Sequence, residues 1–227
     1  AHPEKTPALS YMVMEPLYVR PVRQGDLPQI TGLFRSQDHC HRHLDWRQPL
    51  DWIDSIPFLL LEQNNRVVAA LACPPDPPGI AWLRLFVCSN ALSMPVCWDT
   101  LWKAASSALA GSGTQAAAII QQEWILPLLR SSGFVYRQDI IMFELFLEDM
   151  SEEPSLCTAN IRPMRRDDLP VVAEVDAEAF DLLWRNSLDT LRLGFTQAAW
   201  ADVAESSQGI LGYQISTRNP LGGHLAR

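Results

Sequence analysis

Apolar and polar residues follow two different periods along the chain, and these periods predict alternating strands and helices. Residues 17–22 (LYVRPV) alternate in the manner of a strand, and Pro21 favours a position at the edge of a sheet. From Asp26, apolar residues recur every three or four positions as far as Phe34, which predicts a helix with Asp26 as its N-cap. A second short helix is predicted over residues 44–55.

The next part of the chain is richer in continuous apolar runs. Residues 58–63 and 67–73 are separated by Asn64-Asn65-Arg66, which is typical of a hairpin turn because asparagine tolerates positive φ. Residues 81–88 (AWLRLFVC) are apolar enough for a central strand. Further along, the same patterns predict a helix at 95–110, a buried strand at 115–120, a short helix at 123–132, and one or two closing strands at 134–147.

One stretch of sequence occurs twice. Residues 20–28 read RPVRQGDLP, and residues 162–170 read RPMRRDDLP. With a shift of one further residue, the hairpin that begins at Phe58 lies over the segment that begins at Ala201. The sequence therefore predicts two copies of one domain plan.

The second copy repeats the opening elements of the first. Residues 158–164 (TANIRPM) are predicted to form a strand, and Asp168 is predicted to cap a helix that reaches Phe180. Residues 200–206 and 210–217 are predicted to form a hairpin.

A third matching pair sets the extent of the second copy. Residues 77–84 (PPGIAWLR) lie over residues 220–227 (PLGGHLAR), so the second copy reaches only the beginning of its central strand. We predict a first domain at 17–147, an acidic linker at 148–158, and the N-terminal half of a second domain at 159–227. Because the last residue is an arginine, as a trypsin-like cut would leave, we expect a piece of a longer protein.

Composition narrows the classes of function. A chain of 227 residues with 48% apolar residues can bury a core in one or two domains. The net charge of −8 gives no electrostatic footprint for nucleic acid. The apolar runs are too short to span a bilayer and no signal pattern opens the sequence, so we expect a cytoplasmic protein without membrane contact. The five cysteines, an odd number without tight spacing, are typical of reduced thiols.

The densest group of chemically versatile side chains is the run DHCHRH at residues 38–43. Neutral imidazole and thiolate groups are zinc ligands, but such close neighbours seldom reach one tetrahedral ion, and no distant C-x-x-C pair completes the set. We therefore interpret the run as a solvated loop after the first helix and predict no metal site.

Other conspicuous side chains have plainer interpretations. Trp98 and Trp102 lie at helical spacing, as core residues do. Cys88 and Cys97 have no histidine near them in sequence and are interpreted as small buried hydrophobes. Three more tryptophans are interpreted as core residues, with the lining of a pocket as the alternative: Trp46, Trp52 and Trp124.

The order of these elements, together with RPxRxxDLP, the hairpin, the central strand and LLRSSGF at 128–134, resembles the GNAT superfamily of acetyl-CoA-dependent N-acetyltransferases. The resemblance covers nearly all of the first copy and the first half of the second. It implies an α/β fold with a mixed, mostly antiparallel central sheet flanked by helices. It also implies acetyl-CoA as co-substrate, a small-molecule or peptide amine as acceptor, and no metal.

In this superfamily the pantetheine arm of acetyl-CoA pairs with the backbone of the central strand, provided that the strand has a free edge. The resemblance assigns this role to Leu85, Phe86 and Val87. The pyrophosphate lies on backbone amides at the start of the next helix, where free N–H groups favour anions. On the family pattern, Leu92 falls at the arginine position, and three residues fall at glycine positions: Ser93, Pro95 and Cys97. Proline has no amide hydrogen, so the first copy is not expected to hold the pyrophosphate in the family manner.

The resemblance also places a general acid. The family uses a tyrosine four residues before a glycine that corresponds to Gly133, and Leu129 occupies that position. A leucine cannot donate a proton to the leaving thiolate. We therefore expect a catalytically degenerate first domain, with acetyl transfer to an amine belonging to the second domain in a complete chain. This chain itself is expected to lack a complete active site.

The alternative function is a non-catalytic pair of domains that serves protein association or binds a small ligand in the vestigial cleft. The incomplete second copy would expose a sheet edge, which predicts packing against the first copy or a homodimer. Two positions gain an alternative role from the resemblance. The loop at 38–43 would border the acceptor groove, and His224 would lie at the mouth of the second central strand, where a catalytic base is needed.

Overall fold

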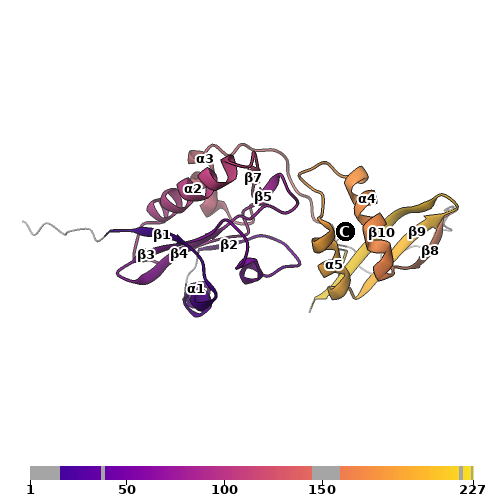
Figure 1. The fold of residues 1–227 in the computed structure, drawn as a ribbon, viewed down its shortest axis with the longest axis horizontal. Helices are drawn as coiled ribbons and strands as arrows, with labels where there is room; N and C mark the ends of the chain where they lie inside the picture. The colour runs from indigo at the N-terminus through magenta and orange to yellow at the C-terminus, as the bar shows by residue number, and fades with distance from the viewer. Residues whose placement is uncertain (1–15, 37–38, 145–158, 220–221, 226) are drawn as a thin grey trace, which may run out of the picture.

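The computed structural model describes residues 16–36, 39–144, 159–219, 222–225 and 227 (Figure 1). Within these ranges the chain forms an N-terminal unit at 16–144 and a C-terminal unit at 159–227. Each unit has its own antiparallel sheet with helices packed on it, so the predicted α/β fold class is confirmed. The predicted linker at 148–158 lies outside the described residues, and the domain boundaries stay predictions.

The N-terminal unit is built on a five-stranded sheet in the order β1-β3-β4-β6-β2, with every neighbouring pair antiparallel. As predicted, β1 lies at the edge, and β3 and β4 form a hairpin whose turn holds Asn64 and Asn65 at φ of 53° and 58°. A separate parallel pair is formed by β5 and β7. The strands are β1 (Tyr18–Pro21), β2 (Cys40–Arg42), β3 (Phe58–Gln63), β4 (Arg66–Ala72), β5 (Ile80–Trp82), β6 (Leu85–Cys88) and β7 (Gln115–Ala117).

The predicted central strand at 81–88 is divided in two. Its first part, β5, pairs with β7, and its second part, β6, pairs with β4. The backbone changes partner between the two parts, because the Leu83 amide donates to Ala117 O (2.7 Å) and the Arg84 amide donates to Ala72 O (2.8 Å). The prediction of one continuous strand was wrong because apolar residues mark burial and do not mark which neighbour a backbone bonds.

Helices cover both faces of the N-terminal sheet (Figure 1). The helix α1 (Leu27–Ser36) packs on one face through Ile30 and Leu33. The helices α2 (Met94–Ala110) and α3 (Leu126–Ser131) pack on the other face, where Trp98 contacts Phe86. Trp98 is fully buried and stacks on Trp102 with ring centroids 5.5 Å apart, so the interpretation of these tryptophans as core residues is confirmed.

Two segments of the N-terminal unit differ from the prediction. The run at 38–43, interpreted as a solvated loop, contains β2, and His41 is buried there. The predicted helix at 44–55 is reduced to a single 3-10 turn, Pro49–Trp52. Gln48 precedes a proline and is extended (φ −70°, ψ 151°), which prevents a longer helix from running through it.

The predicted closing strands are absent from the described part of their region. Residues 134–144 form neither helix nor strand, and residues 145–147 lie outside the described residues. Local β-propensity predicted strands there, but a strand also needs a neighbouring edge to pair with.

The C-terminal unit has a four-stranded antiparallel sheet in the order β11-β10-β9-β8. The predicted strand, helix and hairpin are all present. Its apolar core gathers Leu169 and Val172 from one helix, Leu191 from the next, and Val203 and Ile215 from the hairpin. The elements are β8 (Asn160–Pro163), α4 (Leu169–Ala179), α5 (Leu188–Gln197), β9 (Trp200–Ser206), β10 (Gly209–Asn219) and β11 (Gly222–Leu225).

One of the contacts between the two units is made by a tryptophan. Trp46 of the N-terminal unit packs against the apolar core of the C-terminal unit. Its indole lies on Gly194 of α5, where a Cβ atom would come within 2.8 Å of three ring carbons. The Gln197 side chain donates to the Trp46 carbonyl at 3.1 Å. Trp46, predicted as a core or pocket residue, is therefore an inter-unit contact.

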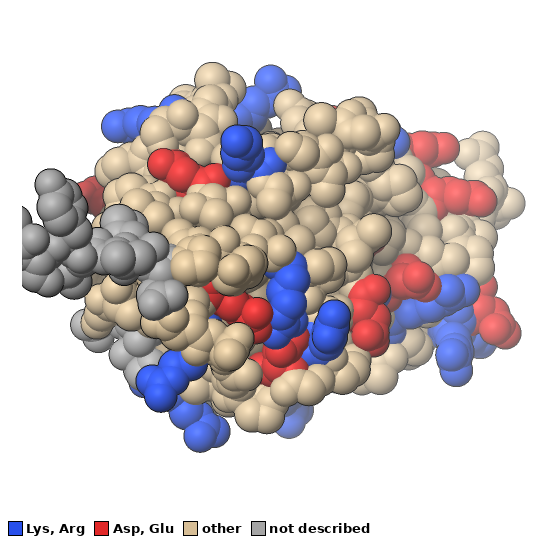
Figure 2. Space-filling model, turned by 60° about the vertical axis from the view of Figure 1, so that its left-hand side comes forward, with Lys and Arg blue, Asp and Glu red and all other residues tan. Residues whose placement is uncertain are grey.

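Figure 2 shows how charge is distributed over one face of the molecule. A broad uncharged band crosses the middle of this face, and basic and acidic side chains lie beside one another along its margins (Figure 2). Among the helices in the described part of the chain, none is both long and apolar enough to cross a bilayer.

Candidate functional site

The repeated motif builds the same ion-pair cluster in both units. Arg20 forms hydrogen bonds to both carboxylate oxygens of Asp26 at 2.7 Å and to Glu62 at 2.6 Å. In the C-terminal unit, Arg162 bonds Asp168 at 2.7 and 2.9 Å and Glu205 at 2.8 Å. The sequence alignment that placed Phe58 over Ala201 also places Glu62 over Glu205, although it did not indicate that these glutamates complete the clusters.

These clusters tie three elements together. Asp26 accepts a hydrogen bond from the Arg23 amide at 2.7 Å, so its carboxylate caps the 3-10 turn before α1 and not the amides of α1 itself. Asp168 accepts from the Arg165 amide in the same way. The arginine beside each aspartate lowers the pKa of that carboxyl. The motif thus has a structural role, because it connects the first strand of each unit to the start of the first helix and to the hairpin.

The residues predicted to pair with the co-substrate lie in β6, but this strand has no free edge. On one side Leu85, Phe86 and Val87 pair with β4, and on the other side they pair with β2. The sequence missed this because β2 was interpreted as part of a loop. That these residues bind acetyl-CoA stays a prediction, and the free edge that it requires is absent from the N-terminal unit as folded.

The segment after β6 does not suit a pyrophosphate either. The helix α2 begins at Met94 with Pro95 in its first turn, where no amide hydrogen is available. The Cys97 amide donates to the Ser93 carbonyl at 3.1 Å, and the Cys97 side chain is fully buried. Leu129, at the position of the family's general acid, is a buried core residue of α3. The residues of this unit therefore do not fit acetyl-CoA in the family manner.

The thiols of Cys88 and Cys97 form a pair beside that segment. A hydrogen bond with the Cys97 thiol lowers the pKa of Cys88, and the same contact raises the pKa of Cys97. Both side chains belong to the apolar core under α2. Their interpretation as buried small hydrophobes is confirmed.

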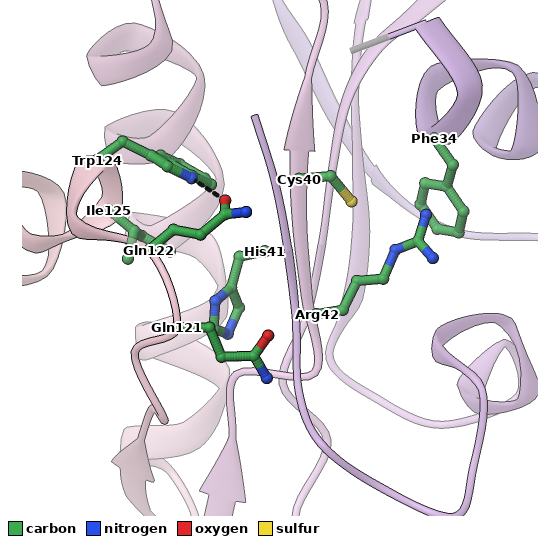
Figure 3. A pocket seen from close by; sticks show the side chains of 8 residues that line it. All are labelled: Phe34, Cys40, His41, Arg42, Gln121, Gln122, Trp124 and Ile125. Carbon is green, nitrogen blue, oxygen red and sulfur yellow. Dashed lines mark hydrogen bonds between the residues drawn. The ribbon is translucent and has the colours of Figure 1, made fainter. Parts of the chain in front are cut away.

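A pocket of about 290 Å³ lies between β2 and the segment at 121–125 (Figure 3). His41 points toward Gln121 on one side of β2, and Arg42 reaches the Phe34 ring on the other, 4.9 Å from its centroid (Figure 3). The Trp124 indole donates to Gln122. Three members of the 38–43 run thus line a pocket: Cys40, His41 and Arg42.

His41 has a defined protonation state in this pocket. Burial lowers its pKa, which favours the neutral ring. Its Nε2 lies 3.0 Å from the Leu83 carbonyl oxygen, so Nε2 carries the proton and Nδ1 is left as an acceptor. The pocket therefore combines aromatic rings, two carboxamides, a neutral imidazole and a guanidinium, a set suited to binding a small polar molecule.

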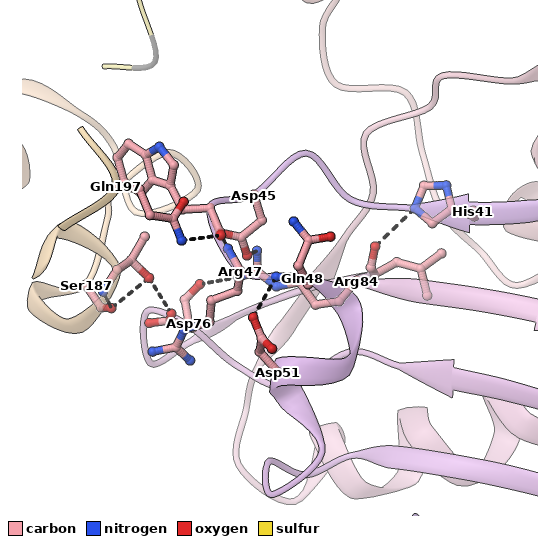
Figure 4. A network of polar contacts seen from close by, with 12 residues as sticks. His41, Asp45, Arg47, Gln48, Asp51, Asp76, Arg84, Ser187 and Gln197 are labelled. Carbon is pink, nitrogen blue, oxygen red and sulfur yellow. Dashed lines mark hydrogen bonds and ion pairs between the residues drawn. The ribbon is translucent and has the colours of Figure 1, made fainter. Parts of the chain in front are cut away.

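A second group of polar side chains lies at the contact between the units (Figure 4). Arg84 pairs with Asp45 at 2.6 Å and donates to the Asp76 carbonyl at 3.1 Å. The Asp76 carboxylate accepts a hydrogen bond from Thr190 of the C-terminal unit at 2.7 Å. Burial lowers the pKa of Arg84 and raises that of Asp45, because desolvation outweighs their mutual attraction. This network holds α5 against the N-terminal unit.

Aromatic rings extend the same contact. His43 stacks on Trp82 with centroids 4.9 Å apart, and Trp82 packs on Trp184 of the C-terminal unit at 5.4 Å. His43 Nδ1 is buried without a hydrogen-bond partner. Burial and the nearby Arg84 cation hold the pKa of His43 well below its usual value.

The C-terminal unit contains a buried carboxylate that sequence reasoning missed. Asp176 is fully buried in α4, where it accepts hydrogen bonds from Arg227 Nε (2.7 Å), the Tyr213 hydroxyl and the Asn186 amide (2.8 Å). Burial raises the pKa of Tyr213. The signal in the sequence was an acid at position 176, on the apolar stripe formed by Leu169 and Val172.

The remaining sequence candidates lie apart from these groups. His224 is exposed in β11, opposite Thr217. Trp52 is a core residue that contacts the guanidinium groups of Arg47 and Arg84, and Trp124 lines the pocket. Among the described side chains, no group of three or more His, Cys, Asp or Glu residues is placed to hold a metal ion.

Solved structures of several acetyltransferases resemble this fold. A GCN5-related N-acetyltransferase from Kribbella flavida superimposes with a TM-score of 0.60 at 14% identity, over 96% of this chain and 58% of that chain. An N-acetylglutamate synthase from Neisseria gonorrhoeae, complexed with coenzyme A and L-arginine, gives 0.40 at 20% identity over 50% of this chain. An aminoglycoside acetyltransferase from an uncultured soil metagenomic sample gives 0.41 at 16% identity over 58% of this chain.

The chain spans 58% of the length of the Kribbella protein and 26% of the length of the N-acetylglutamate synthase. No protein-family model and no curated protein matches the sequence. The Kribbella superposition covers 96% of this chain and therefore extends over both units. The chain therefore has the fold of the GNAT superfamily of N-acetyltransferases, as the sequence predicted.

Proposed function

We propose that this chain is part of an acetyl-CoA-dependent N-acetyltransferase with two GNAT-like domains. The first domain lies at 17–147, residues 159–227 form the N-terminal half of the second, and the transfer of acetyl to an amine belongs to the second domain. The observation that carries the proposal is the superposition of 96% of the chain on one GCN5-related N-acetyltransferase. The acceptor is a small-molecule or peptide amine. The cytoplasm is the proposed location, which suits the free thiols of the described cysteines.

The assignment to the second domain rests on a difference between the units. In the N-terminal unit, β2 covers the edge of β6 and Pro95 interrupts the amides at the start of α2. In the C-terminal unit, β11 pairs with β10, and among the described residues no strand lies on its other edge. Pairing of the acetyl-CoA pantetheine arm with a strand backbone is thus better supported at β11 than at β6.

Two charge insertions test this assignment. Asn90→Glu places a carboxylate in the exposed segment after β6, and His224→Glu places one on exposed β11. Acetyl-CoA is an anion, so we expect His224→Glu to weaken its binding about tenfold or more and Asn90→Glu to leave it unchanged. Calorimetry gives the affinity, and release of the coenzyme A thiol with a panel of amines gives the activity. Wild-type protein that shows no saturable binding at millimolar acetyl-CoA would contradict the proposal.

The pocket beside β2 favours a second function for the N-terminal unit, namely the binding of a small ligand. The Arg42 guanidinium makes no ion pair with a described residue, and the rings of Phe34 and Trp124 lie in the same pocket. A planar molecule that carries one carboxylate suits this combination.

Benzoate is a suitable probe for this pocket. We expect millimolar benzoate to raise the melting temperature of the wild-type protein and not that of Arg42→Ala. Arg35→Ala is the matched control, because Arg35 is an exposed arginine of α1 outside the pocket lining. An equal shift in all three proteins would show that the pocket does not bind the carboxylate.

A further inference from the structure

Two thiols meet where β6 ends and α2 begins. Cys88 is the last residue of β6, and Cys97 lies in the first turn of α2. A hydrogen bond joins the two thiols. Both side chains belong to the apolar cluster between the sheet and α2. A small apolar residue at either position would fill the same space, so the contact between two thiols offers chemistry that packing does not need.

The packing of α2 on the sheet fixes this contact (Figure 1). Phe86 and Cys88 are two residues apart in β6, so their side chains lie on the same face of the sheet. The Phe86 ring meets the Trp98 ring edge to face, with centroids 5.0 Å apart. Cys97 directly precedes Trp98, and both side chains are fully buried. The aromatic contact therefore holds the start of α2 over the end of β6, where the two thiols lie.

The two thiols are chemically unequal. The hydrogen bond from Cys97 lowers the pKa of Cys88, whereas the same contact, together with burial, raises the pKa of Cys97. Cys88 also meets α2 at its first turn, where the positive end of the helix dipole favours a thiolate. Cys88 is thus the nucleophile of the pair, and Cys97 is a neighbour that keeps its proton. A nucleophilic thiol beside a second thiol is the arrangement from which a disulfide forms on oxidation.

A small oxidant has a short path to Cys88. The Cys88 side chain is 5% exposed, and the chain reaches the surface directly after it, because Asn90 and Ala91 are exposed. Residues 89–93 form neither helix nor strand, so movement of this connection breaks no helix or strand. Cys73 differs, since it is fully buried and burial raises the pKa of its thiol to about 12. Among these core thiols, Cys88 is therefore the one placed to react first.

We propose that Cys88 and Cys97 are a redox-active pair that a hydroperoxide converts into a disulfide. The Cys88 thiolate attacks one peroxide oxygen and the O–O bond breaks, which gives a sulfenic acid on Cys88 and an alkoxide or hydroxide that takes a proton from water. The Cys97 sulfur then attacks the Cys88 sulfur. The S–S bond forms, the S–O bond breaks, and the oxygen leaves with the Cys97 proton as water.

The peroxide is thereby reduced by two electrons, and the two thiols are oxidised by two electrons. A dithiol reductant reverses the change by thiol–disulfide exchange. The disulfide ties the end of β6 to the first turn of α2. This inference does not depend on the proposed acetyl transfer.

Mass spectrometry of one tryptic peptide tests the pair. Residues 85–103 lie between Arg84 and Lys103 with no lysine or arginine in between, so this peptide holds both Cys88 and Cys97 and no other cysteine. Folded protein is treated with hydrogen peroxide, unfolded, alkylated and digested. We expect the peptide to lose two hydrogens and to take no alkyl label, and dithiothreitol should restore both labels. A peptide that remains doubly alkylated, or a disulfide to a cysteine outside 85–103, would overturn the proposal.

Single variants separate the roles of the two thiols. Cys97→Ser should stop the reaction at a sulfenic acid on Cys88, which dimedone traps, whereas Cys88→Ser should leave Cys97 reduced. Cys73→Ser is the matched control, because Cys73 is as deeply buried in the same cluster and should leave the disulfide unchanged. A dimedone adduct on Cys97 in Cys88→Ser, and none on Cys88 in Cys97→Ser, would contradict the assignment of Cys88 as the nucleophile.

The melting temperature shows whether the folded protein accommodates the bond. A disulfide between Cys88 and Cys97 restricts the unfolded chain, so peroxide should raise the melting temperature of the wild-type protein by roughly 5 °C, and dithiothreitol should reverse the rise. Peroxide should give no such rise in Cys88→Ser. A fall in the melting temperature of oxidised wild-type protein would show that the bond forms only at the expense of the fold, which would contradict a built-in redox pair.

Discussion

The two units begin alike and diverge at the strand where the family's chemistry would lie. Both contain an arginine that binds an aspartate at a helix start and a glutamate in the hairpin. Beyond the hairpin, β6 of the N-terminal unit is paired on both edges, whereas β11 of the C-terminal unit is paired with β10. The repeated motif therefore marks a shared scaffold and not a shared function. The two units are expected to differ in function because β6 is covered by β2, whereas β11 is paired with β10.

Arg84 and Arg227 sharpen the comparison. They occupy matching positions in the sequence alignment, and each is paired with a buried or nearly buried aspartate. The aspartates come from different elements, because Asp45 lies in the segment after β2 and Asp176 lies in α4. One guanidinium position is thus neutralised in two ways.

The largest expected effect comes from removing the fully buried carboxylate of Asp176. Asp176→Ala should lower the free energy of unfolding by about 3–5 kcal/mol, because the Arg227 charge and the Tyr213 hydroxyl lose their acceptor. Urea denaturation measures this loss. Asp189→Ala, which breaks an exposed pair with Arg192, should cost at most about 1 kcal/mol. Similar losses in the two variants would show that burial does not distinguish these carboxylates.

The next effect concerns the contact between the units. Gly194→Val forces a side chain into the Trp46 ring and should cost about 1–3 kcal/mol. Because the contact couples the units, calorimetry should show one unfolding transition split into two. Gly32→Ala provides a control of opposite sign, since no atom lies within 4 Å of its added Cβ and alanine favours the interior of α1. A single, unshifted transition in Gly194→Val would mean that the contact does not couple the units.

The shared clusters should respond alike to the same change. Arg20→Ala and Arg162→Ala each remove a guanidinium that bonds one aspartate and one glutamate. We expect the melting temperature to fall by roughly 2–4 °C in each. Differential scanning calorimetry of both variants, with exposed Arg130→Ala as reference, checks this. Clearly different falls in melting temperature would show that the two clusters share a geometry but contribute unequally to stability.

The smallest expected effect is a pH dependence of stability that arises from histidines of the N-terminal unit, including His43 at the contact between the units. His43 has a lowered pKa in the folded protein, so the unfolded chain binds its proton more readily. The stability from neutral His43 is therefore full above about pH 6.5 and is lost as the pH falls toward the folded value. His41 acts in the same direction. Urea denaturation at several pH values from about 7.5 to 5.5 should show that the free energy of unfolding falls less steeply with decreasing pH in His43→Gln than in the wild-type protein. Equal slopes in the two proteins would contradict this role of His43.

Local patterns predicted the elements that depend on neighbouring residues. The hairpin turn at Asn64 and Asn65 and the helix that contains Trp98 followed from turn chemistry and helical spacing, and both are present. The ion pair between Arg20 and Glu62 was not predicted, because the two residues lie 42 positions apart in the sequence. A repeat alignment gave the positions of the partners but not their contacts.

Apart from the helix predicted at 44–55, the missed features below depend on long-range pairing. The strand β2 has only three residues, Cys40–Arg42, without an apolar alternation, and its partner β6 lies far along the chain. The break at Leu83 and Arg84 reflects a change of hydrogen-bond partner that apolarity does not encode. The candidate pocket was missed for the same reason, since it exists only where β2 meets the segment at 121–125.

The close contact between Trp46 and Gly194 limits which domains could replace the C-terminal unit. A related domain that replaces the C-terminal unit must have a glycine at the position of Gly194, because the Trp46 indole lies too close for even a methyl group. The replacement must also offer a hydroxyl to Asp76, as Thr190 does. Domain exchange between proteins of this architecture is therefore limited by two positions on one helix face, which makes the units less interchangeable than their shared opening motif indicates.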